Sequence, residues 1–309
     1  MLGGSGMDYV LKTEGLTKAY GGNFVVDHVN MHVKKGDIYG FIGKNGAGKT
    51  TFMRLVAGLA APMEGNIELF GSRELKKQRL RIGTLIEQPG IYDTMTAWEN
   101  MEVMRRNFGI TDKNSTGQML EFVGLSKAGK KKVKNFSLGM KQRLGIAIAL
   151  YRNPDFLILD EPINGLDPEG IKEMRDLLLK LNEEKQITIL ISSHILGELS
   201  KIATNYGIIK EGALIEEFEA DQLESRCRRC QKLIVDNVEL GTTILEEKCH
   251  ITSYDIPEPG TIRVFDGLDQ TWKLNQELVQ GGVRLKESYL TGQDLEDYFM
   301  GLLGGVEHV

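Results

Sequence analysis

The sequence has few cysteines, no long apolar run and no excess of positive charge. Its three cysteines are Cys227, Cys230 and Cys249, too few for a disulfide framework, and they fit a reducing compartment. One C-x-x-C pair is also too little for a zinc site. No stretch approaches the roughly 18 apolar residues of a membrane-spanning helix, and the N-terminus has no signal-peptide pattern. We therefore expect a chain that neither crosses a membrane nor is secreted.

The charge balance narrows the range of partners. The chain carries 43 acidic and 38 basic side chains, for a formal net charge of -5. An acidic chain has no general electrostatic attraction for phosphate backbones, so we expect no nucleic-acid partner. The hydrophobic fraction of 41% is typical of a globular protein, and a length of 309 residues predicts about two domains.

Two kinds of strand are predicted in the first two thirds of the chain. From Asp8 to about Val33 apolar and polar residues alternate, which indicates a layer of antiparallel strands with one buried face. Short, continuous apolar runs follow, and such runs are typical of parallel strands covered on both faces. These runs are Ile38–Ile42, Phe156–Leu159 and Ile187–Ile191.

Helical patterns separate these strands. Residues from about 89 to 150 have helical spacing and are expected to form a helical subdomain. A further helix is introduced by Asp167 as N-cap, with Pro168 in its first turn. Strand and helix patterns that alternate in this way predict an α/β domain with a parallel core sheet.

A boundary is expected near residue 220, where a predicted closing hairpin ends and the sequence becomes more polar. We assign residues 7–219 to the α/β domain and residues 220–309 to a small α+β accessory domain, while residues 1–6 read as an added linker. The accessory domain is predicted to contain two strands and three helices, at Lys232–Val235, Thr261–Phe265, Val238–Glu247, Leu268–Gln280 and Leu295–Leu303.

A glycine-rich loop follows the first buried strand and precedes a helical run. Its residues match G-x-x-x-x-G-K-[ST], a specific signal in that context. The glycines let backbone N–H groups turn toward phosphate oxygens, the lysine bridges the β and γ phosphates, and the following threonine offers its hydroxyl to Mg²⁺. The residues predicted to bind nucleotide here are Gly43, Asn45, Gly46, Ala47, Gly48, Lys49, Thr50 and Thr51.

Two carboxylates end the buried strand at residues 156–159. Asp160 has the position of a Walker B aspartate and is expected to hold Mg²⁺ together with Thr50. Glu161 stands one residue further, at the carboxyl edge of the sheet, where ligands bind in such folds. We interpret Glu161 as the residue that polarises the attacking water.

Together with five further elements, these motifs resemble the ATP-binding cassette ATPases. The further elements are Tyr20, Gln88, the signature Phe136–Arg143, the loop Gly165–Pro168 and His194. They occur in the family's order over residues 8–219. The resemblance implies a P-loop NTPase cassette, built from an antiparallel β layer, a parallel core sheet and a helical subdomain, with ATP and Mg²⁺ as its cofactors.

The resemblance also implies roles for these residues. Tyr20 is expected to stack on adenine, and Gln88 to approach both Mg²⁺ and the attacking water. His194 is expected to contact the γ-phosphate and to hold Glu161 in place. Catalysis is thus assigned to Glu161, His194, Gln88 and Lys49, and the metal to Thr50, Gln88 and Asp160.

The signature departs from the family's common Leu-Ser-Gly-Gly-Gln at two positions, where Leu138 and Met140 stand. Ser137 and Gly139 are kept, and they are expected to contact a γ-phosphate bound by the opposite subunit. Asp167 is expected to cap its helix and to lie at the same dimer interface. The variant signature looks most like the bacitracin-resistance and lantibiotic-immunity branch of the family.

The resemblance therefore implies the ATP-hydrolysing motor subunit of an exporter. One chain carries one phosphate loop and one signature, so it is expected to pair with a second copy or a similar subunit. A separate permease would provide the membrane path, and the motor would lie in the cytoplasm at the inner face of the membrane. Peptide antibiotics are the implied substrates.

Two alternatives stay open from the sequence. An exporter of the same build for a drug, a lipid or sodium has the same motor, because the substrate contacts lie in the permease. A cassette ATPase without a transport role is the other alternative. Members that act on ribosomes carry two cassettes in one chain, and DNA-repair members insert long coiled coils, and neither feature occurs here.

Overall fold

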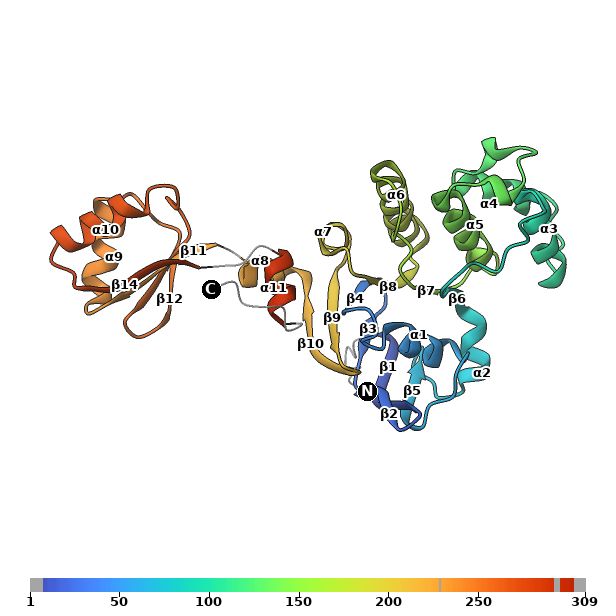
Figure 1. The fold of residues 1–309 in the computed structure, drawn as a ribbon, viewed down its shortest axis with the longest axis horizontal. Coiled ribbons are helices and arrows are strands. Elements are labelled where there is room, and N and C mark those ends of the chain that lie inside the picture. The colour runs from blue at the N-terminus through green and yellow to red at the C-terminus, as the bar shows by residue number, and fades with distance from the viewer. Residues whose placement is uncertain (1–7, 228, 292–294, 303–309) are drawn as a thin grey trace, which may run out of the picture. The chain divides into compact units, whose positions relative to one another are not determined.

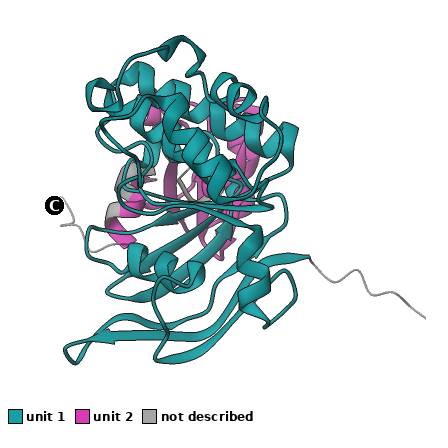
Figure 2. Cartoon of the chain, turned by 90° about the vertical axis from the view of Figure 1, so that its right-hand side faces the viewer, with its two compact units in different colours: residues 1–220 teal, residues 221–309 magenta. Residues whose placement is uncertain are grey.

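A computed structural model of the chain describes residues 8–227, 229–291 and 295–302 (Figure 1). The chain divides into two compact units, residues 1–220 and residues 221–309, which Figure 2 shows in teal and magenta. The first unit holds the predicted nucleotide motifs.

The first unit is organised around a six-stranded sheet in the order β10-β9-β4-β8-β7-β6. Its five strands from β9 to β6 are parallel, and β10 closes the edge as an antiparallel hairpin with β9. The predicted buried strands and the hairpin are thereby confirmed. The strands are β4 (Ile38–Ile42), β6 (Ile82–Leu85), β7 (Phe156–Leu159), β8 (Thr188–Ser193), β9 (Asn205–Lys210) and β10 (Ala213–Glu219).

An antiparallel layer forms the second sheet of this unit, as the alternating pattern predicted. β1 is its centre and pairs with β2, β3 and β5. A shared apolar core joins the layer to the parallel sheet, and helix α1 contributes Phe52 to it, 5.2 Å from the ring of Phe41 between centroids. The strands are β1 (Tyr9–Tyr20), β2 (Asn23–Val29), β3 (His32–Lys34) and β5 (Glu64–Leu69).

Capping side chains mark the start of three helices of this unit, α3, α5 and α6. Thr96 and Glu99 form a capping box at α3, Ser137 caps α5, and Asp167 caps α6 with Pro168 in the first turn, as predicted. The helices are α1 (Lys49–Ala57), α2 (Leu75–Gln78), α3 (Ala97–Asn107), α4 (Ser115–Phe122), α5 (Leu138–Leu150), α6 (Pro168–Lys185) and α7 (Leu196–Leu199).

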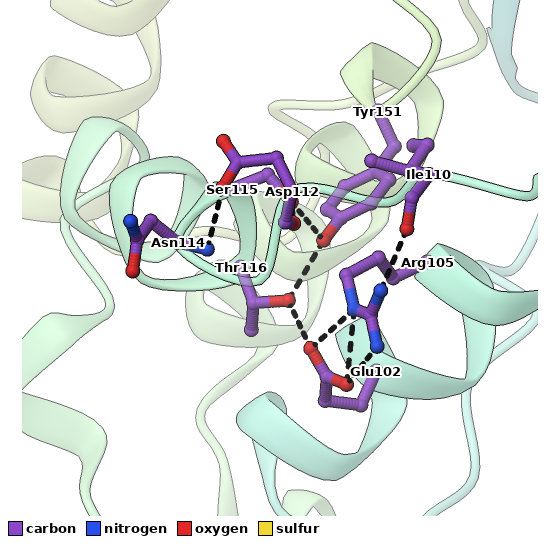
Figure 3. Close-up of polar contacts among 8 residues, drawn as sticks. All are labelled: Glu102, Arg105, Ile110, Asp112, Asn114, Ser115, Thr116 and Tyr151. Carbon is purple, nitrogen blue, oxygen red and sulfur yellow. Dashed lines mark hydrogen bonds and ion pairs between the residues drawn. The ribbon is translucent and has the colours of Figure 1, made fainter.

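A polar network ties α3, α4 and the end of α5 together (Figure 3). Thr116 donates to Glu102 Oε1 at 2.6 Å and lies 2.7 Å from the hydroxyl of Tyr151. Arg105 donates to the same carboxylate and to the carbonyl of Ile110. These bonds give the helical region of residues 89–150 a defined internal arrangement.

The second unit has a β-α-β-β-α-β order, as in ferredoxin-like folds. Its antiparallel sheet runs β12-β13-β11-β14, and Leu233 and Ile262 of the sheet share one core with Leu245 and Leu278 of the helices. The elements are α8 (Ala220–Cys227), β11 (Cys230–Val235), α9 (Val238–Glu247), β12 (Tyr254–Glu258), β13 (Thr261–Val264), α10 (Thr271–Gln280), β14 (Leu285–Thr291) and α11 (Leu295–Leu302).

Candidate active site

The glycine-rich loop connects the end of β4 to the start of α1, and close packing requires its glycines. A Cβ atom on Gly43 would lie 2.6 Å from the carbonyl oxygen of Ile209. Gly48 caps α1 with a φ of 109°, and a Cβ atom there would lie 2.2 Å from the carbonyl oxygen of Val25. Larger residues at 43 and 48 would therefore push the loop away from the strands that support it.

The loop encloses a small cavity at the N-terminus of α1. Its volume is about 170 Å³, and the helix end directs backbone N–H groups and positive potential at it. Lys49 is only 6% exposed, and its ammonium donates to the carbonyl of Gly43 at 2.6 Å. The lining residues are Val25, Lys44, Asn45, Gly46, Ala47, Gly48, Lys49, Thr50, Thr51 and Glu161.

Asp160 lies directly beside this loop because β7 ends at the same edge of the sheet as β4. The hydroxyl of Thr50 donates to Asp160 Oδ2 at 2.7 Å, and the carboxylate is nearly buried. A hydroxyl and a carboxylate oxygen so close together are the hard oxygen donors that Mg²⁺ prefers. This donor pair fits the metal that the sequence analysis assigned to Thr50 and Asp160.

Glu161, the next residue along the chain, also lines the cavity. Its Oε2 lies 2.7 Å from His194 Nδ1, and its Oε1 lies 3.4 Å from the ammonium of Lys49. Glu161 Oε1 is buried and has no hydrogen-bond partner among the described residues. The backbone of Glu161 has a φ of 50°, an uncommon conformation for a residue other than glycine. The carboxylate thus has one oxygen oriented by His194 and one that is ion-paired with Lys49 but accepts no hydrogen bond.

The other predicted site residues lie outside the lining of this cavity. Tyr20 is 50% exposed at the end of β1, with the ammonium of Lys18 5.1 Å from its ring centroid. Gln88 is exposed after β6, and Ser137 and Asp167 are exposed at the N-caps of α5 and α6.

The signature and the Gly165–Pro168 loop touch each other within one chain. A Cβ atom on Gly139 would lie 3.6 Å from Leu166, and one on Gly165 would lie 3.2 Å from Leu138. The apolar Leu138 is 45% exposed. The two segments therefore form one continuous surface.

Sequence reasoning missed three residues around the cavity. Val25 and Lys44 line it, and Ser192 of β8 bonds to both acidic residues that follow β7. Lys44 lies inside the recognised loop motif, so its position could have been inferred. Val25 and Ser192 come from other strands and carry no motif of their own.

Neither cysteine with a described side chain suggests a metal site. Cys230 and Cys249 are free thiols whose pKa values are raised by burial, and the side chain of Cys227 lies outside the described residues. No group of three or more His, Cys, Asp or Glu in the described part of the chain could hold a metal ion.

Within the same residues, no helix has the length and apolarity to cross a membrane.

A buried strand, a glycine-rich loop and a helix, with a carboxylate on a neighbouring strand, define a P-loop nucleotide hydrolase. Comparison with known proteins narrows this class. The ABC transporter family model matches residues 26–164. The bacitracin transport ATP-binding protein BcrA of Bacillus licheniformis is 46% identical over 302 residues, which are 97% of this chain and 99% of that protein.

Two further proteins are similar over about two thirds of the chain. The lantibiotic transport ATP-binding protein SrtF of Streptococcus pyogenes is 45% identical over 217 residues, 70% of this chain and 93% of the relative. The dimeric post-hydrolysis structure of the ATP-binding cassette MJ0796, bound to ADP and Pi, matches with a TM-score of 0.61 and 26% identity, over 68% of this chain and 98% of that one. The chain belongs to the ABC transporter ATP-binding proteins, and it is an ATPase subunit of a transporter.

Proposed function

We propose that this chain drives the export of peptide antibiotics of the bacitracin or lantibiotic type. The observation that carries the proposal is the match to the bacitracin transport protein. Its 46% identity extends over 97% of the chain and so includes the accessory unit. A shared motor alone would account for similarity over the first unit only.

The cavity supports binding of Mg-ATP. Its backbone amides, the helix N-terminus and Lys49 provide positive potential for the β and γ phosphates. Thr50 and Asp160 would hold Mg²⁺, with Gln88 as a further ligand that reaches the site from its exposed position. The ion, when bound, neutralises charge on the phosphate oxygens.

Hydrolysis depends on Glu161 and His194. A carboxylate oxygen without a hydrogen bond can accept the proton of an attacking water. A carboxylate has no proton to donate, so Nδ1 of His194 carries the hydrogen between them and fixes the orientation of Glu161. For the His194 ring to donate to a γ-phosphate at the same time, Nε2 must also be protonated.

A second subunit completes the site. Ser137 and Gly139 do not line the cavity of their own chain, so in this proposal they contact a γ-phosphate in the opposite subunit. The continuous surface of the signature and the Gly165–Pro168 loop, including Asp167, lies at that interface. Two copies, or one copy and a similar cassette, then form two complete sites. The similarity to a dimeric cassette supports this pairing.

We further infer that Tyr20 stacks on adenine, since its exposed ring offers a π-face. A separate permease carries the substrate, and this chain acts on it from the cytoplasmic face of the membrane. ATP-driven closure of the two subunits moves the helices of the permease.

The test is antibiotic susceptibility in a sensitive bacterial host. The chain is expressed with the permease encoded beside it, and growth is measured in bacitracin, in a lantibiotic and in an unrelated drug. We expect protection against a peptide antibiotic that disappears with Glu161→Gln. Protection against the unrelated drug alone would contradict the proposed substrate class. The absence of any protection, when the permease is shown to co-purify with the chain, would contradict it as well.

A further inference from the structure

Ser192 hydrogen-bonds to both of the acidic residues that follow β7, Asp160 and Glu161. It stands near the end of β8, which pairs with β7 in parallel, and the residue is fully buried. Its hydroxyl donates to Asp160 Oδ1 at 2.7 Å and accepts the backbone N–H of Glu161 at 2.9 Å. One side chain thus bonds to both residues.

The first of these bonds orients the carboxylate of Asp160. A serine hydroxyl has one hydrogen, and here that hydrogen is directed at Oδ1. The other oxygen, Oδ2, faces the hydroxyl of Thr50, which donates to it at 2.7 Å. With Ser192 on one oxygen and Thr50 on the other, rotation of the carboxylate would break both bonds.

The second bond supports an unfavourable backbone. Glu161 has a φ of 50°, and the left-handed region costs about 1 kcal/mol or more for a residue with a Cβ atom. Such conformations persist where the surroundings hold them. Without Ser192, the part-buried N–H of Glu161 would lose this hydrogen bond, which is itself unfavourable.

We propose that Ser192 is a positioning residue whose single hydroxyl sets the orientation of both the metal-binding Asp160 and the water-polarising Glu161. The inference rests on the proposed Mg-ATP site and adds to it a residue from β8. Groups that hydrogen-bond to metal-binding carboxylates typically contribute 10- to 100-fold to metal affinity or activity. Ser192 therefore acts on the metal and on turnover together, without contact with either phosphate or water.

The test measures metal binding without catalysis. Mn²⁺, a paramagnetic substitute for Mg²⁺, is titrated by electron paramagnetic resonance into the full chain with ADP, and ADP binding without metal is measured by calorimetry. In Ser192→Ala we expect Mn²⁺ affinity to fall at least about 10-fold, while metal-free ADP affinity is unchanged. In steady-state assays kcat should fall by a similar factor, with a smaller change in KM for ATP.

Three further variants separate the hydroxyl from packing. Ser192→Thr keeps the hydroxyl and should keep most of the Mn²⁺ affinity, whereas Ser192→Cys keeps the volume but donates weakly and should resemble Ser192→Ala. Thr188→Val removes another buried hydroxyl from the same strand, one that accepts the N–H of Gly36. This control should leave Mn²⁺ binding as in the parent.

Each outcome decides between the two proposals. A parent chain that binds no Mn²⁺ with ADP overturns the proposed nucleotide site, and this inference with it. A parent that binds Mn²⁺ while Ser192→Ala and Ser192→Cys bind it equally well overturns the inference alone. Equal losses in Ser192→Thr and Ser192→Ala would show that packing, not the hydroxyl, matters. If Ser192→Ala does not fold, Ser192→Cys gives the same comparison.

Discussion

His194 Nδ1 lies 2.7 Å from Glu161 Oε2, although the two residues are 33 positions apart in the chain. The contact exists because β7 and β8 are parallel neighbours, so the residues that follow them meet at one edge of the sheet. The other oxygen of Glu161 lies 3.4 Å from the ammonium of Lys49. The carboxylate is therefore held between a ring nitrogen and a cation.

Replacing Glu161 by Gln should stop hydrolysis without stopping ATP binding. Glutamine keeps the size of the side chain but cannot accept the proton of water, so we expect turnover to fall by at least about 10²-fold, which corresponds to about 2.7 kcal/mol of barrier. The variant should accumulate as an ATP-bound dimer because hydrolysis normally reopens the closed dimer. Phosphate release and gel filtration with Mg-ATP measure the two effects.

Two results would contradict this expectation in different ways. Hydrolysis at the parent rate would show that Glu161 is not the base, and His194 would become the leading candidate. Slow hydrolysis without dimer formation would show that Leu138 and Met140 weaken the contact with the opposite subunit, so that closure requires the permease.

Lys49→Ala should lose tight nucleotide binding. Lys49 is 6% exposed, and solvent cannot replace a buried cation beside the β and γ phosphates. Calorimetric titration with ATP measures the loss, and the exposed Lys35→Ala serves as a charge-matched control. Unchanged affinity in Lys49→Ala would count against the phosphate-loop assignment.

Glu102→Gln should make the chain less stable at neutral pH but not in acid. Hydrogen bonds from Arg105, and then from Thr116, lower the pKa of Glu102. A carboxylate with a lowered pKa in the folded state stabilises the fold above its ordinary pKa of about 4.3, and this contribution is lost as the pH falls through the folded-state pKa. Urea denaturation at several pH values should show the difference from the parent shrinking toward low pH.

The exposed Glu121→Gln on α4 is the matched control for this prediction. It removes the same charge from the neighbouring helix, so it corrects for the change in net charge. A pH-independent difference between Glu102→Gln and the parent would mean that the network of Figure 3 does not depend on the ionised carboxylate.

A chain that ends at residue 220 should retain basal ATPase activity. The loop, the two carboxylates that follow β7 and His194 all belong to the first unit, which has its own core. We expect the accessory unit to affect dimer stability or regulation instead. Phosphate release and gel filtration test this, with circular dichroism to establish that the shortened chain is folded. Loss of nucleotide binding in a folded chain would place the boundary elsewhere.

The strands that the sequence predicted are those with a strong pattern. All residues of β4, β7 and β8 are buried, and short buried runs of this kind are typical of parallel strands covered on both faces. In contrast, β12 and β14 were missed because none of their residues is buried, so neither strand has a buried face. Their strand conformation comes from pairing with β13 and β11.

Several parts of the site were set by neighbours along the chain. These parts are the glycine-rich loop, the helix that follows it and the Asp167 cap. Their conformations depend on steric limits on φ and on hydrogen bonds between residues three or four positions apart. The sequence by itself therefore determined the class of chemistry, and it predicted most of the residues that we propose take part in it.

Only the tertiary structure decided how those residues meet. The Thr50 hydroxyl donates to Asp160 although the two residues are 110 positions apart in the chain. The Ser192 hydroxyl donates to the same carboxylate from 32 positions away. Both contacts depend on the strand order, which places β8 between β4 and β7. No local pattern encodes that order, because it follows from how the whole sheet buries its two faces. The role of Ser192, a common residue in a strand without a motif, therefore became visible only when β8 was placed beside β7.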